Sequence, residues 1–165
     1  MKKVSGLDLS ITATGATHTV EGEACTHLIA TKGTKDNRLV VIRNQVLTCV
    51  EGSELVLIEG YLNKSMSAGT TGMVHGAVRS ILLEHGIPYA TLPPASLKKY
   101  ATGNGNATKT DMALAAMKRA GLEIRNDNEC DAWWLWVAAM DYSGQPVFPL
   151  PALNRQSLDK IHIEV

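Results

Sequence analysis

The stretch GLDLSITATG, residues 6–15, decides which fold the chain is expected to adopt. Asp8 stands between two leucines in an extended, apolar segment that begins at Val4, which predicts a first strand carrying a carboxylate. Residues 12–19 and 24–31 are rich in threonine and apolar residues and are separated by the turn-like sequence EGE. Together, these segments predict an antiparallel meander of three strands.

Beyond the meander, helical and extended patterns alternate. The apolar run 55–58, which ends at Glu59, is typical of a buried central strand, and residues 87–92 predict another. Helices are expected over residues 39–50, 73–85, 95–100, 110–120 and 131–141, with a mobile segment at 63–72. We therefore predict an α/β domain over residues 1–142, with a mixed five-stranded sheet flanked by helices, and a C-terminal tail, 143–165, without a clear element.

The composition bounds the function. A chain of 165 residues with 45% apolar residues suits one domain with a real core. Lysine and arginine together number 16, as do aspartate and glutamate, so bulk charge does not hold the chain to nucleic acid. A DNA site must therefore be a local basic patch, separate from any acidic cluster.

The cysteines and the apolar runs indicate the compartment. Cys25, Cys49 and Cys130 are far apart and form no CxxC pair, which argues against a zinc site and for free thiols in a reducing compartment. The N-terminal sequence lacks the apolar region of a signal peptide. The longest apolar run, 132–140, is about half of the ~20 residues that span a bilayer. We expect a cytoplasmic protein without a membrane segment.

Carboxylates recur at the ends of apolar segments. Asp8 lies in the first strand, Glu59 ends the strand at 55–58, and Asp131 opens the last helix. Asp127 and Asn128 precede Asp131 by four and three residues, so either shares its face if that helix starts early. Converging carboxylates stay ionised together only around a hard cation, and oxygen ligands favour Mg²⁺ or Mn²⁺. Taken singly, each residue is also explained by helix capping or by a solvated strand end.

Four segments resemble the RuvC family of Holliday-junction resolvases, in order and in spacing. They are GLDLSITATG, VLIEGY (56–61), ASLKKYATGNGNATKTDM (95–112) and NECDAWWLW (128–136). The resemblance is to the small, phage-type members of the family and covers roughly residues 3 to 142. It implies a ribonuclease H-like fold, a homodimer, and an endonuclease that resolves four-way DNA junctions by paired symmetric nicks.

The resemblance also implies which residues act. Asp8, Glu59 and Asp131 match the family's metal-binding carboxylates, which hold two Mg²⁺ or Mn²⁺ ions, and a rigid central strand makes Asp8 the natural bridging ligand. Lys98 and Lys109 match lysines implicated in DNA contact and, for Lys109, catalysis. Such a two-metal site activates water and stabilises the leaving oxygen in an in-line displacement.

The chain departs from the family pattern at two places. The family has an acid or a histidine three residues before the last aspartate, where this chain has Asn128, which offers a carbonyl oxygen but no charge. Either Asn128 is a weaker catalytic and metal ligand, or Asp127 replaces it, or the asparagine is an inactivating substitution that traps the junction uncut. The family's aromatic wedge is not evident, and Tyr61 and Leu62 are the nearest candidates.

The DNA-binding surface is expected around the glycine-rich loop TGNGNAT. The candidate DNA-binding residues are Lys98, Lys99, Lys109, Tyr61, Leu62 and Lys64, and Lys118 and Arg119 could add phosphate contacts. For any single lysine, a solvated helix face is the alternative. The apolar helix at 74–83 is the candidate dimer interface, with packing in the core as its alternative. The tryptophans at 133, 134 and 136 are expected in the core or at the interface rather than stacked on bases.

The sequence is also compatible with other functions. A catalytically weakened junction-binding protein is compatible with Asn128, and a related nuclease acting on flaps, forks or RNA hybrids is compatible with the fold. The GLDLSITATG segment also resembles the phosphate hairpin of actin-like ATPases. Those enzymes need two such domains, and 165 residues are too few.

Overall fold

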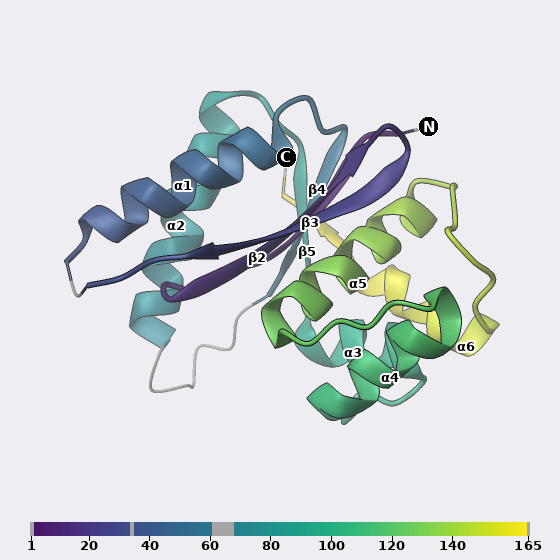
Figure 1. The fold of residues 1–165 in the computed structure, drawn as a ribbon. Coiled ribbons are helices and arrows are strands. Elements are labelled where there is room, and N and C mark those ends of the chain that lie inside the picture. The colour runs from purple at the N-terminus through teal and green to yellow at the C-terminus, as the bar shows by residue number, and fades with distance from the viewer. Residues whose placement is uncertain (1, 34, 61–67, 165) are drawn as a thin grey trace.

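The protein folds into three layers, with one twisted sheet between two groups of helices (Figure 1). The computed structural model describes residues 2–33, 35–60 and 68–164. The strands are β1 (Val4–Asp8), β2 (Ala13–Val20), β3 (Glu23–Ala30), β4 (Leu55–Glu59), β5 (Tyr89–Leu92) and β6 (His162–Ile163). The helices are α1 (Asn37–Val50), α2 (Ala68–Glu84), α3 (Pro94–Thr102), α4 (Lys109–Ala120), α5 (Asp127–Tyr142) and α6 (Ala152–Arg155), with a 3₁₀ helix, η1 (Gln156–Lys160).

The sheet is mixed and its order is β3-β2-β1-β4-β5-β6. The first three strands form the expected antiparallel meander, whereas β1, β4 and β5 run parallel to one another. The carboxyl ends of these three parallel strands therefore meet at one edge of the sheet, where α/β proteins usually place their sites. The α/β class and the mixed pairing expected from the sequence are confirmed.

The predicted number of strands was wrong. The sixth strand, β6, comes from the C-terminal segment and pairs antiparallel with β5, through Ala90 opposite Ile163 and Thr91 opposite His162. The same segment also forms α6 and η1, although we expected no element after residue 143. A strand of two residues is too short to leave a periodic pattern in the sequence, which is why it was missed.

A buried hydrogen-bond network ties this segment to the domain. The Tyr100 hydroxyl donates to Oδ2 of Asp141, and Arg155 of α6 pairs with the other carboxylate oxygen at 2.7 Å. The Asn154 side chain donates to the Tyr100 carbonyl oxygen. The side chain of Asp141 is only 1% exposed, so the partners satisfy a charge that would otherwise be buried alone.

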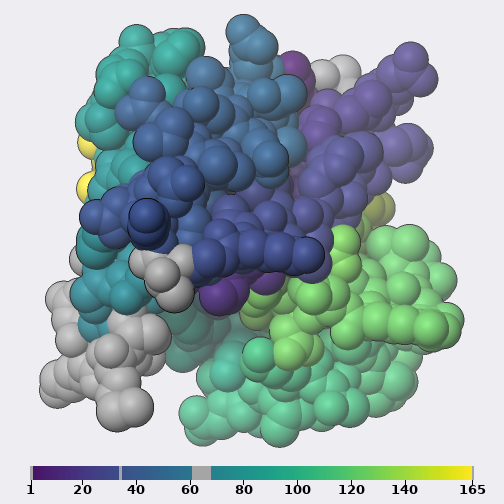
Figure 2. Space-filling view, turned by 60° about the vertical axis from the view of Figure 1, so that its left-hand side comes forward, coloured from purple at the N-terminus to yellow at the C-terminus, as the bar shows by residue number. Residues whose placement is uncertain are grey.

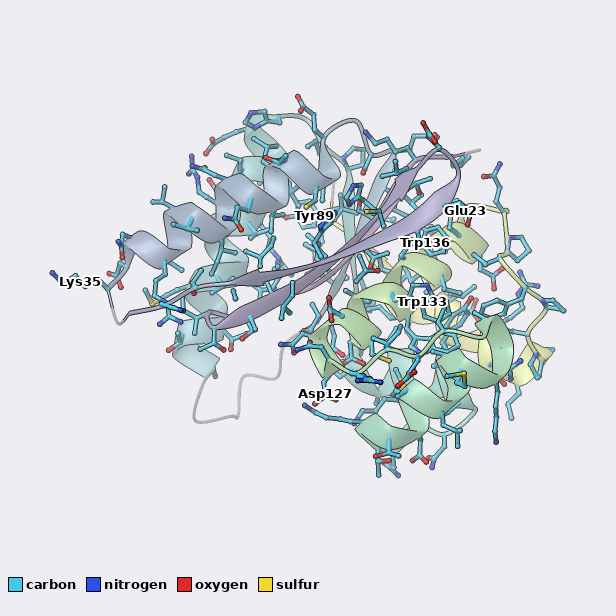
Figure 3. The ribbon with its side chains drawn as sticks, viewed as in Figure 1. Glu23, Lys35, Tyr89, Asp127, Trp133 and Trp136 are labelled. Atoms are coloured by element: carbon cyan, nitrogen blue, oxygen red, sulfur yellow. The ribbon has the colours of Figure 1, made fainter. Side chains whose placement is uncertain are left out.

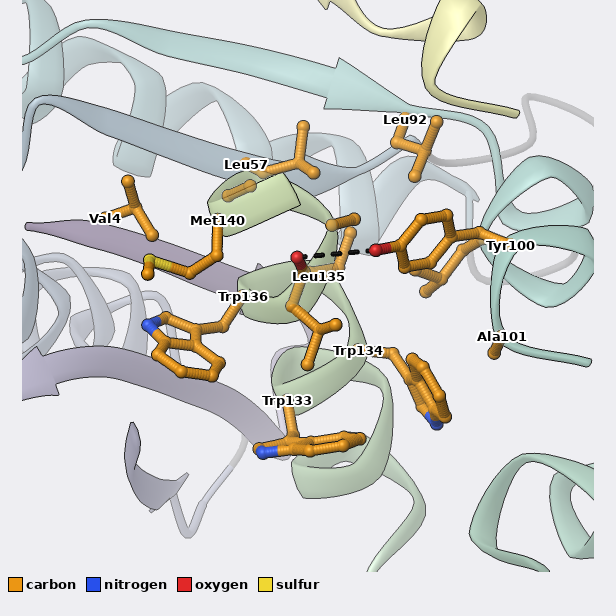
Figure 4. Close-up of a cluster of buried hydrophobic side chains, with 14 of the residues drawn as sticks. Val4, Leu57, Leu92, Tyr100, Ala101, Trp133, Trp134, Leu135, Trp136 and Met140 are labelled. Atoms are coloured by element: carbon orange, nitrogen blue, oxygen red, sulfur yellow. Dashed lines mark hydrogen bonds between the residues drawn. The ribbon is translucent and has the colours of Figure 1, made fainter. Parts of the chain in front are cut away.

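Helix α5 forms the centre of one layer and packs directly on the sheet. Its tryptophans, Trp133, Trp134 and Trp136, are at most 3% exposed and lie in one cluster with residues of β1, β4, β5 and α3 (Figure 4). The core role predicted for them is confirmed, and such burial leaves no ring face for a DNA base. The indole nitrogens of Trp134 and Trp136 donate to the Met112 carbonyl oxygen and the Thr19 hydroxyl, respectively.

Helices α1 and α2 cover the opposite face of the sheet. Val74, Val78 and Leu82 of α2 are fully buried in this second cluster, while Met73 and Leu83 are 46% and 51% exposed. The helix predicted at 73–85 therefore packs one face in the core and keeps two apolar residues at the surface. Across the described residues, no helix has the length and the apolar character needed to cross a bilayer.

Candidate active site

Asp8 and Glu59 lie side by side at the carboxyl edge of the sheet. They end the neighbouring parallel strands β1 and β4, in which Leu7 is the partner of Ile58. Side chains alternate along a strand, and Val4 and Leu57, an even number of residues before each acid, both face the α5 layer. Both carboxyl groups therefore project toward the start of α5.

Two glycines allow α5 to come close to these strands. A Cβ atom on Gly6 would lie 2.4 Å from the carbonyl oxygen of Ala132, and one on Gly15 would lie 2.0 Å from that of Asn128. No side chain fits at either position without moving the helix. Because Gly15 is the register partner of Asp8, this close approach brings the first turn of α5 beside the Asp8 carboxyl group.

The first turn of α5 begins four residues earlier than predicted. Asn126 caps it, and its side-chain oxygen accepts hydrogen bonds from the backbone N–H groups of Asn128 and Glu129. Asp127 and Asn128 are thus not the cap, although Asp127 stands in the first turn, where an acidic residue favours the start of a helix. Both residues are inside the helix and precede Asp131 by one helical turn.

The three acidic residues are half-buried, and their carboxyl groups repel one another. Burial raises the pKa of Asp8 to about 7, with a further increase from Asp131, and burial raises that of Asp131 to about 6. Burial, followed by the charges of Asp8 and Asp131, raises the pKa of Glu59 well above its usual range. The structure therefore brings together the three acids from β1, β4 and α5 that the sequence singled out.

Two lysines offset part of this negative charge. Lys109, the first residue of α4, lowers the pKa of all three acids, and Lys98 of α3 lowers that of Glu59 and Asp131. The Nζ atom of Lys109 lies 2.7 Å from Oδ2 of Asp127, which Figure 3 shows at the start of α5. This pair is at the surface, since the two side chains are 70% and 49% exposed.

Asn128 and Asp127 have different environments. The side-chain nitrogen of Asn128 donates to the carbonyl oxygen of Ala13 at 2.6 Å, which leaves its side-chain oxygen as the atom that could bind a metal. The charge of Asp127, in contrast, raises the pKa of both Asp8 and Asp131. Asp127 is therefore close enough to the carboxyl cluster to interact with it, while Asn128 holds the helix to β2.

The structure describes only some of the other residues that were predicted to bind DNA. Lys99 is a half-buried neighbour of Lys98 on α3, and Lys118 and Arg119 line a hollow beside α4 together with Asp111 and Thr102. That hollow contains none of the three acids. Tyr61, Leu62 and Lys64 lie outside the described residues.

The donor set fits a hard divalent cation. Asp8, Glu59 and Asp131 offer only oxygen atoms, which suit Mg²⁺ and Mn²⁺ and not softer metals. Buried like charges with raised pKa values are stabilised in their ionised form when a cation lies among them. Oxygen donors of this kind are the ones from which the sequence predicts a Mg²⁺ or Mn²⁺ site.

Some residues that build the site were missed in the sequence. Gly6 and Gly15 belong to the stretch GLDLSITATG, but their role depends on α5, which lies more than a hundred residues away in the chain. The cap at Asn126 was overlooked in favour of the acids that follow it. A helix-start signal was available there, because asparagine is among the best capping residues.

Comparison with solved structures finds similar chains, among them two structures of one protein, Thermus thermophilus RuvC. The Thermus thermophilus RuvC structure has a TM-score of 0.70 and 25% identity, over 87% of this chain and 97% of that chain. The T. thermophilus RuvC in complex with a Holliday junction substrate has a TM-score of 0.73 and 21% identity, over 99% of both chains. At the latter identity, the similarity shows the fold alone.

The scan against family models and the search of the curated proteins gave no match. The structural similarity nevertheless extends over nearly the whole chain, including the C-terminal segment that adds β6. The protein is thus RuvC-like, as the sequence resemblance implied, and its ribonuclease H-like fold is confirmed.

Proposed function

We propose that this protein is a divalent-metal-dependent endonuclease that resolves four-way DNA junctions, a crossover junction endodeoxyribonuclease. The observation that carries the proposal is the mutual electrostatic interaction of three half-buried carboxyl groups, from Asp8, Glu59 and Asp131, at the carboxyl edge of a RuvC-like sheet. The nuclease domain, which the sequence predicts over residues 1–142, would also include the C-terminal segment that adds β6 to the sheet, and would act on DNA in the cytoplasm.

Asp8, Glu59 and Asp131 would hold Mg²⁺ or Mn²⁺. When bound, two such ions supply an activated water and the positive charge that stabilises the leaving oxygen of a phosphodiester. Asp8 is the best candidate for a shared ligand, because its strand lies between β2 and β4 in the sheet. Because the three acids are half-buried, water is partly excluded around them, which strengthens their interaction with a cation.

The lysines at the rim would position the DNA backbone. Lys98 and Lys109 already act on the carboxyl cluster, so a phosphate held between them would lie close to the metal ligands. When DNA binds, Lys109 would leave its ion pair with Asp127 and pair with this phosphate instead. Lys99, Lys64, Tyr61 and Leu62 would extend the contact along the arms of the junction, as the family resemblance implies.

A homodimer would supply the two sites that paired, symmetric nicks require. Met73 and Leu83 support α2 as the interface, because they are exposed apolar residues on a helix whose other face is fully buried. A mass corresponding to two chains in light scattering at micromolar concentration, with or without junction DNA, is the expected result. A single-chain mass under both conditions would contradict the dimer.

For the fourth ligand, we favour Asp127 over Asn128. The charge of Asp127 raises the pKa of Asp8 and of Asp131, whereas the side-chain nitrogen of Asn128 donates a hydrogen bond to the carbonyl oxygen of Ala13. The family resemblance instead places Asn128 at the position of the ligand. Its side-chain carbonyl oxygen would be the only atom of the side chain able to bind a metal. A junction-binding protein that does not cut is the second candidate function, and the missing charge at position 128 is what favours it.

The direct test compares a labelled synthetic four-way junction with a linear duplex of the same arm sequences, in Mg²⁺ and in Mn²⁺. We expect cleavage of the junction alone and its loss in Asp8→Asn, which keeps the size of the side chain and removes its charge. Binding without cleavage by the unsubstituted protein, at saturating metal, would support the second candidate. Equal cleavage of the duplex would contradict junction specificity.

A further inference from the structure

Two histidines and two cysteines gather on the side of the molecule opposite α5. His18 of β2 and Cys25 of β3 are register partners, and His27 stands opposite Ala16 on the same strand pair. Ala16 is buried in the cluster under α1, so these side chains share the face of the sheet that α1 covers. Cys49 reaches this face from the last turn of α1.

The potential ligand atoms are close together. One ligand atom each of His18, His27 and Cys49 lies within 4.8 Å of the others. A tetrahedral zinc ion needs ligand atoms roughly 3.4–3.8 Å apart, as follows from Zn–N and Zn–S bonds of about 2.1 and 2.3 Å. The three side chains therefore need only small rotations to share one ion.

Cys25 is the natural fourth ligand. Its sulfur lies 3.3 Å from Nε2 of His27. Cys25 is half-exposed on the edge strand β3. A change of its side-chain rotamer would therefore move its sulfur relative to His18, His27 and Cys49.

The group has features that packing alone does not explain. The imidazole rings of His18 and His27 stack, with centroids 5.2 Å apart and planes at 13°. Within the described part of the chain, Nδ1 of His18 is buried without a hydrogen-bond partner, a state that is uncommon for a buried polar atom.

We propose that His18, His27, Cys49 and Cys25 form a binding site for one zinc ion. The nitrogen and sulfur ligands select a borderline-soft metal, whereas the oxygen ligands at Asp8, Glu59 and Asp131 select Mg²⁺ or Mn²⁺. The spacing of the cysteines along the chain argued against zinc, but the fold brings residues 18, 25, 27 and 49 to one place. The site does not depend on the proposed nuclease function.

Zinc at this site would fasten the edge strand β3 to helix α1. These elements form neighbouring parts of the surface in Figure 2. An edge strand exposes unpaired backbone groups and is prone to fraying or to pairing with other chains, so a cross-link to α1 would hold it in place. A metal that binds only the folded state also stabilises that state in proportion to its affinity and concentration.

The test uses the full chain, reduced and freed of metal, with excess Mg²⁺ present to occupy the carboxylate site. Titration with Co²⁺ should give a thiolate-to-cobalt charge-transfer band at one ion per chain, and Zn²⁺ should displace it. Carboxylates cannot produce this band, so the signal belongs to the cysteines. Absence of the band in the reduced, folded protein would overturn the proposal.

Substitutions of the proposed ligands test which side chains bind the zinc ion. Cys49→Ser and His18→Ala should each weaken Zn²⁺ binding by more than about 100-fold, because even the outer partners of metal ligands contribute 10–100-fold. Cys25→Ser, at a half-exposed position that should leave the fold intact, should also weaken binding and remove part of the band. His162→Ala, an exposed histidine on β6, is the matched control and should bind normally.

Three further results bear on the proposal. Unchanged Zn²⁺ affinity in Cys49→Ser or in Cys25→Ser would remove that residue from the site and overturn the assignment. A Cys25–Cys49 disulfide that forms in air, in a protein that binds no zinc when reduced, would show a redox pair instead. Normal zinc binding by Asp8→Asn would separate this site from the nuclease site, whether or not the protein cuts junctions.

Discussion

Asn128 donates a hydrogen bond from its side-chain amide to the carbonyl oxygen of Ala13, over 2.6 Å, and so joins the first turn of α5 to the start of β2. The same turn lies against Gly15, where a Cβ atom would collide with the backbone of Asn128. Because Asp131 is one turn further along α5, this contact helps to position one of the three half-buried acids. The asparagine is explained by its role in assembling the site.

Asn128→Asp tests this explanation. An aspartate cannot donate to Ala13, and its carboxylate would repel that carbonyl oxygen, so we predict a loss of about 1–3 kcal/mol in the free energy of unfolding and no faster cleavage. Urea denaturation and junction cleavage measure the two effects. Asn44→Asp, at an exposed position on α1, is the control for the change in charge. Severalfold faster cleavage by Asn128→Asp would show that the position needs a carboxylate ligand.

Asp127→Asn tests the alternative ligand. Removing this charge should raise the Mg²⁺ concentration needed for half-maximal cleavage by about tenfold, an effect typical of residues that support a metal site. The control is Asp36→Asn, because Asp36 is exposed at the start of α1 and its side chain makes no capping bond. An unchanged Mg²⁺ requirement would leave Asp127 only as the partner of Lys109.

Lys109→Ala tests the proposed phosphate contact. Loss of one contact should weaken junction binding and make its salt dependence shallower by about one unit of log–log slope. Lys160→Ala, on the exposed face of η1, provides a lysine control far from the site in sequence. If both variants keep the parental slope, Lys109 does not touch a phosphate.

The raised pKa values predict how metal-free stability depends on pH. In the folded protein, the Asp8 carboxyl group keeps its proton up to about pH 7, because its pKa is raised from 3.8 to about 7. The free energy of unfolding should therefore fall as pH rises from 3.8 to about 7. Asp8→Asn removes this loss, and it should be more stable than the unsubstituted protein above pH 7 without metal, by about 1–4 kcal/mol. Mg²⁺ should stabilise the unsubstituted protein much more at pH 8 than at pH 5. Equal stabilisation at both values would mean that the acids do not take up the ion.

The sequence was sufficient to predict the parts of the site that lie on strong local patterns. Asp8 and Glu59 interrupt or end apolar strands, and Asp131 precedes an unbroken apolar helix, so each was recognisable as a carboxylate held by a buried element. Asp8 and Glu59 lie side by side because β1 and β4 pair in parallel, whereas the sequence predicted only that the sheet is mixed.

The remaining features depend on contacts between distant residues. The two-residue strand β6 is defined only by its pairing with β5, and the Asn128–Ala13 bond joins residues 115 positions apart. His18, His27 and Cys49 likewise have no spacing typical of a zinc motif, and only the strand register and α1 bring them together. Local periodicity carries no information about such pairs.

The most direct test of the central claim uses a supercoiled plasmid that extrudes a cruciform, which is a four-way junction. With Mg²⁺ or Mn²⁺, paired nicks across the junction convert the circle directly into a linear molecule, whereas separate single nicks leave an open circle. We predict that linear plasmid forms first, that its ends map to the base of the cruciform, and that Asp8→Asn and Glu59→Gln yield none. Accumulation of open circles alone, or unchanged linearisation by either variant, would contradict the account.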